Sequence, residues 1–155
     1  MRKRFRVGVV VAAMIGVLAG CAFGGVYVKQ IPAALNEIEG VTSVEVGKGY
    51  DGLTRKTVIK IYLASDPVTA ENIQRVFVAL GDIDFSGAGN INLSFLNVQT
   101  KARSDVRNGV QDVIDNQGGP TGDYLPAALD YFARSAGLSI SNPERLKEIA
   151  DYMRD

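Results

Sequence analysis

The N-terminal segment places the strongest limit on which residues of this chain can form its fold, because its pattern is typical of a targeting segment. An uncharged run extends from Val7 to Val28, and the small residues Ala19 and Gly20 stand inside it, just before Cys21. A basic start, an apolar middle and a small-residue exit are the three parts of a secretory signal peptide. We therefore expect the fold to be built from the residues after Gly20. The basic residues that open the chain are Arg2, Lys3, Arg4 and Arg6.

The four residues Leu18-Ala19-Gly20-Cys21 resemble the lipobox of bacterial lipoproteins. The resemblance implies a diacylglycerol thioether on Cys21, with palmitate among the acyl groups, and cleavage after Gly20. The mature lipoprotein would begin with lipidated Cys21 and be held at the cell membrane, outside the cytoplasm, by this lipid anchor. Cys21 is the only cysteine of the chain, which agrees with a residue reserved for one modification.

An uncleaved transmembrane helix is the alternative interpretation of the same segment. The uncharged run from Val7 to Val28 is long enough to cross a bilayer, which takes about 20 residues. Its glycines at positions 8, 16, 20, 24 and 25 make it a poorer match to such a helix. In both cases the basic end is expected in the cytoplasm and the rest of the chain outside.

The residues after Gly20 carry a small negative charge and contain no histidine. They hold 13 of the 17 basic residues and all 17 acidic residues of the chain, so their formal charge is −4. Nucleic-acid binding needs clustered cations, so we expect no nucleic acid as a partner. The lack of histidine and of a second cysteine removes the usual general base, nucleophile systems and transition-metal ligands. We expect neither an enzyme nor a cofactor.

Hydrophobic periodicity over residues 26–98 predicts the element order β-α-β-β-α-β. This order resembles the ferredoxin-like split βαβ arrangement, an antiparallel four-stranded sheet with two helices on one face. Ser65-Asp66-Pro67 is expected to begin the second helix, with Asp66 as its cap. The expected strands are 26–28, 41–47, 56–64 and 91–95, and the expected helices are 31–39 and 67–80. The expected core residues are Ile59, Ile61, Leu63, Ile73, Val76, Phe77, Leu93 and Phe95.

The chain is expected to form an α+β fold with a helical C-terminal part. Apolar stripes predict three helices after residue 104. These helices either cover the open face of the sheet or form a separate bundle. We favour the first, because both faces of the 56–64 strand are largely apolar. The expected organisation is a lipoprotein signal peptide at 1–20, a lipid anchor and short leader at 21–25, a ferredoxin-like domain at 26–100, and a helical segment packed on it at 104–155.

Two loop motifs match ligand-binding sequences in part. The segment Gly47–Gly52 matches the G-x-G-x-x-G dinucleotide fingerprint, but it lies between two expected strands, so we interpret it as a hairpin turn. Residues 82–87 match the first half of a calcium loop. Leu93 occupies position 12 of that loop, where a bidentate glutamate would be needed, so only weak calcium binding is expected. The candidate ligands are Asp82, Asp84, Ser86 and Asn90.

These features together predict a membrane-anchored, non-enzymatic lipoprotein that acts as a binding or assembly module of the bacterial cell envelope. Its expected partners are the membrane, through the lipid on Cys21, and an envelope protein. The alternative is a lipoprotein that holds a small ligand or a lipid in a pocket between the sheet and the C-terminal helices. A packed apolar core would favour the first hypothesis, and a cavity of several hundred Å³ at that place would favour the second.

Overall fold

A computed structural model describes residues 25–154, and its first element is a helix, α1, over Tyr27–Leu35. The sequence analysis expects a strand at 26–28, and this prediction is wrong. Tyr27, Ile31 and Leu35 are all buried, and their spacing of four residues places them on one face of a helix.

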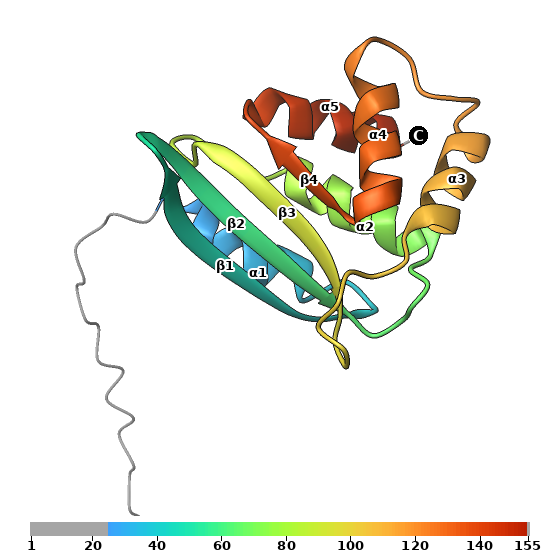
Figure 1. Ribbon diagram of the computed structural model, residues 1–155, viewed down its shortest axis with the longest axis horizontal. Coiled ribbons are helices and arrows are strands. Elements are labelled where there is room, and N and C mark those ends of the chain that lie inside the picture. Colours follow the sequence, from blue (N-terminus) through green and yellow to red (C-terminus); the bar gives the residue numbers. More distant parts are fainter. Residues whose placement is uncertain (1–24, 155) are drawn as a thin grey trace, which may run out of the picture.

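A four-stranded mixed sheet forms the centre of the fold (Figure 1). Its strands follow one another across the sheet in chain order. The first and second strands are antiparallel, the second and third are parallel, and the third and fourth are antiparallel. The strands are β1 at Val41–Asp51, β2 at Thr54–Leu63, β3 at Asn90–Asn97 and β4 at Gly137–Ile140.

The fold is therefore α+β, but the strand order does not follow the antiparallel ferredoxin-like pattern. Helix α2, Ala70–Gly81, connects β2 to a parallel neighbour, β3, so no strand lies between them. The fourth strand, β4, comes from the segment in which the sequence analysis expects only helices. It has four residues, and Leu138 and Ile140 are buried. Two alternating apolar residues are too short a pattern to separate a strand from the end of a helical stripe.

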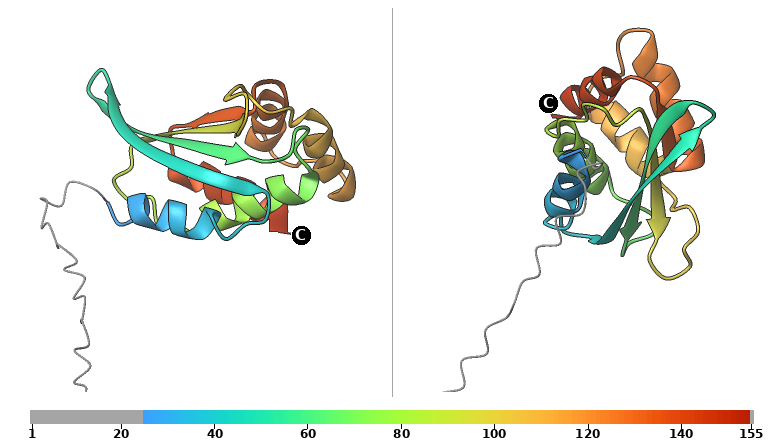
Figure 2. Two further views of the ribbon diagram at one scale, coloured as in Figure 1. Left: turned by 90° about the horizontal axis from the view of Figure 1, so that it is seen from below. Right: turned by 90° about the vertical axis from the view of Figure 1, so that its left-hand side faces the viewer.

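The three helices of the C-terminal part extend the core that the sheet forms with α1 and α2, and α5 lies on the same side of the sheet as these two helices (Figure 2). Their bounds are α3 at Arg107–Asn116, α4 at Tyr124–Ser135 and α5 at Pro143–Arg154. Helices α3 and α5 pack against α2, and α4 packs against α3 and β4. None of the helices in the described part of the chain has both the length and the hydropathy that a membrane span requires.

The other face of the sheet is not covered by these helices, contrary to the arrangement that the sequence analysis favours. The prediction that both faces of β2 are buried depended on Val58 and Tyr62, which lie on the face opposite the core. Val58 is only half-buried. Tyr62 is buried beneath the side chain of Lys101, whose ammonium lies 4.6 Å from the centre of the tyrosine ring. The side chain of Lys101, a loop residue, therefore lies over Tyr62 where a helix was predicted to pack.

Helix α2 begins three residues later than the sequence analysis expects. Thr69 caps it, because its hydroxyl oxygen accepts a hydrogen bond from the backbone N–H of Asn72 at 3.2 Å. Asp66 has a different role. Its carboxylate accepts a hydrogen bond from the backbone N–H of Asp105 at 2.7 Å, which joins the loop before α2 to the loop before α3.

Candidate functional site

The residues of the expected signal peptide and the lipidation candidate Cys21 lie outside the described residues. The described chain begins at Gly25, four positions after that cysteine. Gly25 is therefore the point at which the described chain enters the fold, and the surfaces around it are the ones nearest to Cys21 along the chain.

The four residues of the calcium candidate lie between the end of α2 and the start of β3, and contacts are seen for three of them. Asp82 forms an ion pair with Arg154 of α5. Asp84 accepts hydrogen bonds from the backbone N–H and the hydroxyl of Ser86, at 2.9 and 2.5 Å. These bonds hold the pKa of Asp84 below its usual range, because they stabilise the carboxylate. Asn90 is the first residue of β3. Among residues 25–154, no group of three or more acidic, histidine or cysteine side chains is placed to hold a metal ion.

The glycine motif at 47–52 belongs to the β1–β2 hairpin, so the interpretation as a turn is confirmed. Asp51 pairs with Thr54, which leaves Gly52 and Leu53 as a two-residue loop. Gly52 has a φ of 60°, a conformation that glycine adopts without the steric cost that other residues meet. The motif does not open a helix, which a dinucleotide site would require.

A basic hollow of about 650 Å³ lies behind the tip of this hairpin. It is bounded by the hairpin, by the beginning of α1 and by the loop that leads into β3. Three of its lining residues are basic and none is acidic. A concave surface lined by one sign of charge attracts ions of the opposite sign. The lining residues are Gly25, Tyr27, Lys48, Gly49, Tyr50, Arg55, Lys56, Ser86, Gly87 and Ala88.

Tyr27 forms the inner wall of the basic hollow and is held there by polar and aromatic contacts. Its hydroxyl lies 3.4 Å from the buried hydroxyl of Thr57. The Thr57 hydroxyl donates to the carbonyl oxygen of Ala88 at 3.0 Å. The tyrosine ring packs against Phe85, with ring centres 5.8 Å apart, and the ammonium of Lys48 lies 5.5 Å from the centre of the same ring. The start of α1 is thereby fixed against both the hairpin and the β3 loop.

A second hollow, of about 410 Å³, has the opposite charge character. It lies between the end of α2 and the start of α5. Its lining includes the acidic side chains Asp82, Asp84 and Glu144 and a single basic side chain, Lys147. Cations therefore line the hollow behind the hairpin tip, and acids line an adjoining hollow at the loop after α2, with Ser86 in both linings.

The space between the sheet and α4 is filled by aromatic rings. Phe77 of α2, Phe95 of β3 and Phe132 of α4 are each fully buried. The ring centre of Phe132 lies 5.2 Å from that of Phe77 and 5.0 Å from that of Phe95, and both contacts are edge-to-face. This is the place at which the alternative hypothesis expects a ligand pocket, and the residues there form a packed core.

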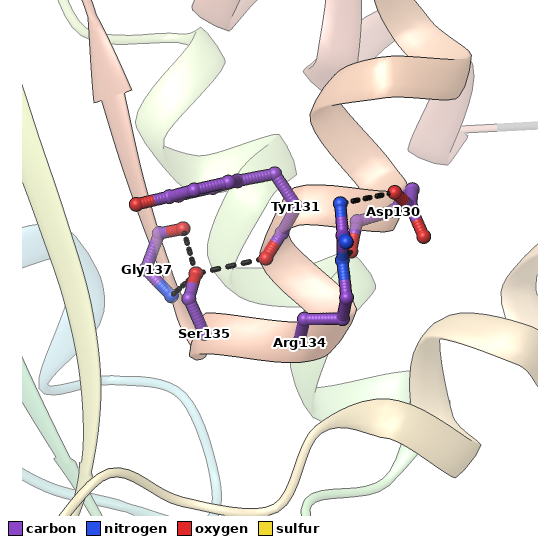
Figure 3. A network of polar contacts seen from close by, with 5 residues as sticks. All are labelled: Asp130, Tyr131, Arg134, Ser135 and Gly137. Carbon is purple, nitrogen blue, oxygen red and sulfur yellow. Dashed lines mark hydrogen bonds and ion pairs between the residues drawn. The ribbon is translucent and has the colours of Figure 1, made fainter.

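The junction of α4 and β4 carries an exposed network of polar contacts (Figure 3). Asp130 pairs with Arg134 at 2.5 Å along the helix. The hydroxyl of Ser135 lies 2.8 Å from the carbonyl oxygen of Tyr131 and 2.9 Å from that of Gly137. These contacts satisfy backbone groups where the helix ends, so we assign them a structural role. The side chain of Tyr131 is 53% exposed at this end of the molecule.

The basic hollow was not predicted from the sequence, although part of its pattern is visible there. Residues equidistant from a hairpin turn lie opposite each other, so Gly49 pairs with Lys56 and Tyr50 pairs with Arg55. A basic cluster around Gly52 was therefore predictable once the hairpin was assumed. The proximity of Gly25 and Tyr27 to that cluster was not predictable, because it depends on how α1 packs. Comparisons with protein-family models, with curated proteins and with solved structures find no match to this chain.

Proposed function

We propose that this chain is a membrane-anchored, non-enzymatic lipoprotein that serves as a binding or assembly module of the cell envelope. The observation that carries the proposal is the short distance along the chain from the lipobox cysteine to the fold. Gly25 already lines the basic hollow, and it follows Cys21 by four residues. Four residues reach at most about 15 Å when extended. A lipid on Cys21 would therefore hold the hairpin end of the fold close to the bilayer, outside the cytoplasm.

The same placement turns the opposite end of the molecule away from the bilayer. Helices α3 and α4 lie at that end (Figure 1). The uncovered face of the sheet runs between the two ends and carries polar side chains. Lys60 and Glu45 form an ion pair at 3.6 Å on this face, and Ser139 donates to Asn92 at 2.9 Å. We propose that an envelope protein binds here, because the packed core favours binding through a surface over binding in a pocket.

The anchor is tested by replacing Cys21 with alanine in the full-length chain. Mass spectrometry of the unchanged protein is expected to find an acylated N-terminal peptide that begins with Cys21. Cys21→Ala is expected to retain residues 1–20 and to lose the acylated form. Ala22→Ser is the matched control, since it changes the neighbouring residue and leaves the thiol. A Cys21→Ala protein that stays equally membrane-bound, alongside an unchanged protein without acylation, would show a transmembrane anchor instead.

The binding surface is tested with a photoreactive amino acid in the anchored protein. Placed at Lys60 on the uncovered sheet face, it is expected to yield one discrete adduct with an envelope protein after illumination of intact cells. Placed at Arg75, which lies on α2 and pairs with Glu71, it is expected to yield none. The same adduct from both positions would contradict a binding site on the sheet face. No adduct from Lys60 or from neighbouring face positions would contradict the binding module itself.

A further inference from the structure

We propose that the tip of the β1–β2 hairpin inserts into the surface of an anionic bilayer, and that the basic hollow behind it binds the phosphates of the lipid headgroups. This inference rests on the proposed function, which brings a membrane to this end of the molecule. It adds to the lipid anchor a second point of contact, made by the folded domain itself. Three independent features of the hairpin end support it: its apolar tip, its cations and its position.

The tip presents two large hydrophobic side chains that are mostly exposed. Leu53 stands in the two-residue loop and is fully exposed, and Tyr50 is 67% exposed. Gly52 beside it keeps the loop narrow, so that the leucine projects beyond the strands. A fully exposed leucine contributes nothing to the core, whereas transfer of its side chain into the acyl boundary of a bilayer is favourable. Tyrosine is a residue that prefers the interface between headgroups and water.

The cations stand directly behind the tip. Arg55 is two residues from Leu53, and Lys56 and Lys48 line the same hollow. Asp51 is the only acidic residue between Glu45 and Asp66, a stretch that holds four basic residues. The residues after Gly20 have a net formal charge of −4, so the positive hairpin end is a local feature and does not follow from the overall composition. Basic residues close to an anionic surface are attracted to its phosphates.

The third feature is the position of the hairpin relative to Gly25, where the described chain begins. The tip and the first described residues lie at the same end of the long axis of the molecule (Figure 1), and they stand on opposite sides of that axis (Figure 2). Gly25 lines the basic hollow together with Arg55 and Lys56. A chain of four residues from Cys21 to Gly25 reaches about 15 Å at most, which keeps this end near the bilayer. The exposed side chain of Val26 adds a further apolar group beside the hollow.

The chain contains no tryptophan, so the tryptophan emission of a variant comes from the single introduced residue and allows a direct test. Full-length acylated protein carrying Leu53→Trp is reconstituted into vesicles of phosphatidylethanolamine and phosphatidylglycerol. Its emission is expected to be blue-shifted relative to the detergent-solubilised protein and protected from the aqueous quencher acrylamide. Tyr131→Trp is the matched control. Like Leu53, Tyr131 is an exposed large hydrophobic residue, but it lies at the opposite end of the molecule. Its tryptophan variant is expected to show neither the blue shift nor the protection from acrylamide.

The role of the cations is tested in the Leu53→Trp background. Arg55→Gln is expected to reduce the ratio of inserted to free tips about fivefold, which corresponds to the roughly 1 kcal/mol that one basic residue contributes at an anionic surface. Arg134→Gln removes a cation from the opposite end and is expected to leave the ratio unchanged. Vesicles of phosphatidylcholine alone are expected to give a smaller blue shift. An equal shift in these neutral vesicles would overturn the role of the cations.

Failure of this inference can be distinguished from failure of the proposed function. Co-sedimentation with vesicles reports the anchor, and tryptophan emission reports the tip. Protein that co-sediments while Trp emission and quenching stay unchanged would overturn the inference and leave the anchor intact. Leu53→Cys gives a second readout that does not depend on a bulky ring. Its thiol is expected to react more slowly with a membrane-impermeant maleimide in anionic vesicles than in detergent, and an equal rate would also overturn the inference.

Discussion

Replacing Phe132 with alanine is expected to lower the free energy of unfolding of residues 22–155 by about 3–5 kcal/mol. The ring is fully buried and makes edge-to-face contacts with Phe77 and Phe95, so its removal leaves a cavity at the meeting point of α2, β3 and α4. Edge-to-face pairs contribute about 0.5–1.5 kcal/mol beyond the burial of their area. Because three elements converge on this ring, the site cannot collapse around the void without moving one of them.

Urea unfolding of the lipid-free protein, followed by circular dichroism, measures this loss. Tyr131→Ala is the matched control, because it removes the neighbouring ring of the same helix from an exposed position. It is expected to change stability by only about 0.5 kcal/mol. If Phe132→Ala cost less than about 1 kcal/mol, α4 would not be part of the cooperative core, and the C-terminal helices would form a unit of their own.

Replacing Gly89 with alanine is expected to destabilise the protein by about 2–5 kcal/mol, by combining two separate effects. Its φ of 70° lies in the left-handed region, which costs a residue with a side chain roughly 1–2 kcal/mol. A Cβ atom at this position would also overlap the carbonyl oxygen of Arg55, a backbone atom of β2 that cannot rotate away. Overpacking of this kind adds about 1–3 kcal/mol.

Gly87 provides a control that separates the two effects. Its φ is 77°, close to that of Gly89, but a Cβ atom there would have no neighbour within 4 Å. Gly87→Ala is therefore expected to show the backbone cost alone. The difference between the two variants measures the close approach of the β3 loop to β2. Equal losses of stability in urea unfolding would mean that the loop can move away from Arg55, and that the hollow behind the hairpin is not fixed in shape.

The core residues could be predicted from the sequence because each lies in an element with a long, regular apolar pattern. Ile59, Ile61 and Leu63 alternate along β2, and the apolar residues of α2 repeat at helical spacing. All the expected core residues are at most 2% exposed. Burial of this kind follows from local periodicity, which requires no knowledge of the partner that covers each face.

The strand order could not be predicted in the same way, because pairing between distant segments leaves no local pattern. The position of β4 beside β3 depends on Leu138 and Leu93 meeting across 45 positions of sequence. The burial of Tyr62 depends on the side chain of Lys101, which reaches over it from a loop. In the candidate site, the charges around the hairpin could be read from the register of the strands. Their position beside Gly25 depends on the packing of Tyr27, which was predicted to lie in a strand and lies in helix α1.

The late origin of β4 in the chain has a consequence for how the protein is made. Until residues 137–140 are synthesised, one edge of β3 has no neighbouring strand, because β4 is the strand that pairs with it. A nascent chain that leaves the ribosome from its N-terminus can form the β1–β2 hairpin early, because that contact is local. It cannot complete the sheet until nearly the whole polypeptide is available. In the secretion route that we propose, this order of segments would delay completion of the sheet until nearly the whole polypeptide has been made.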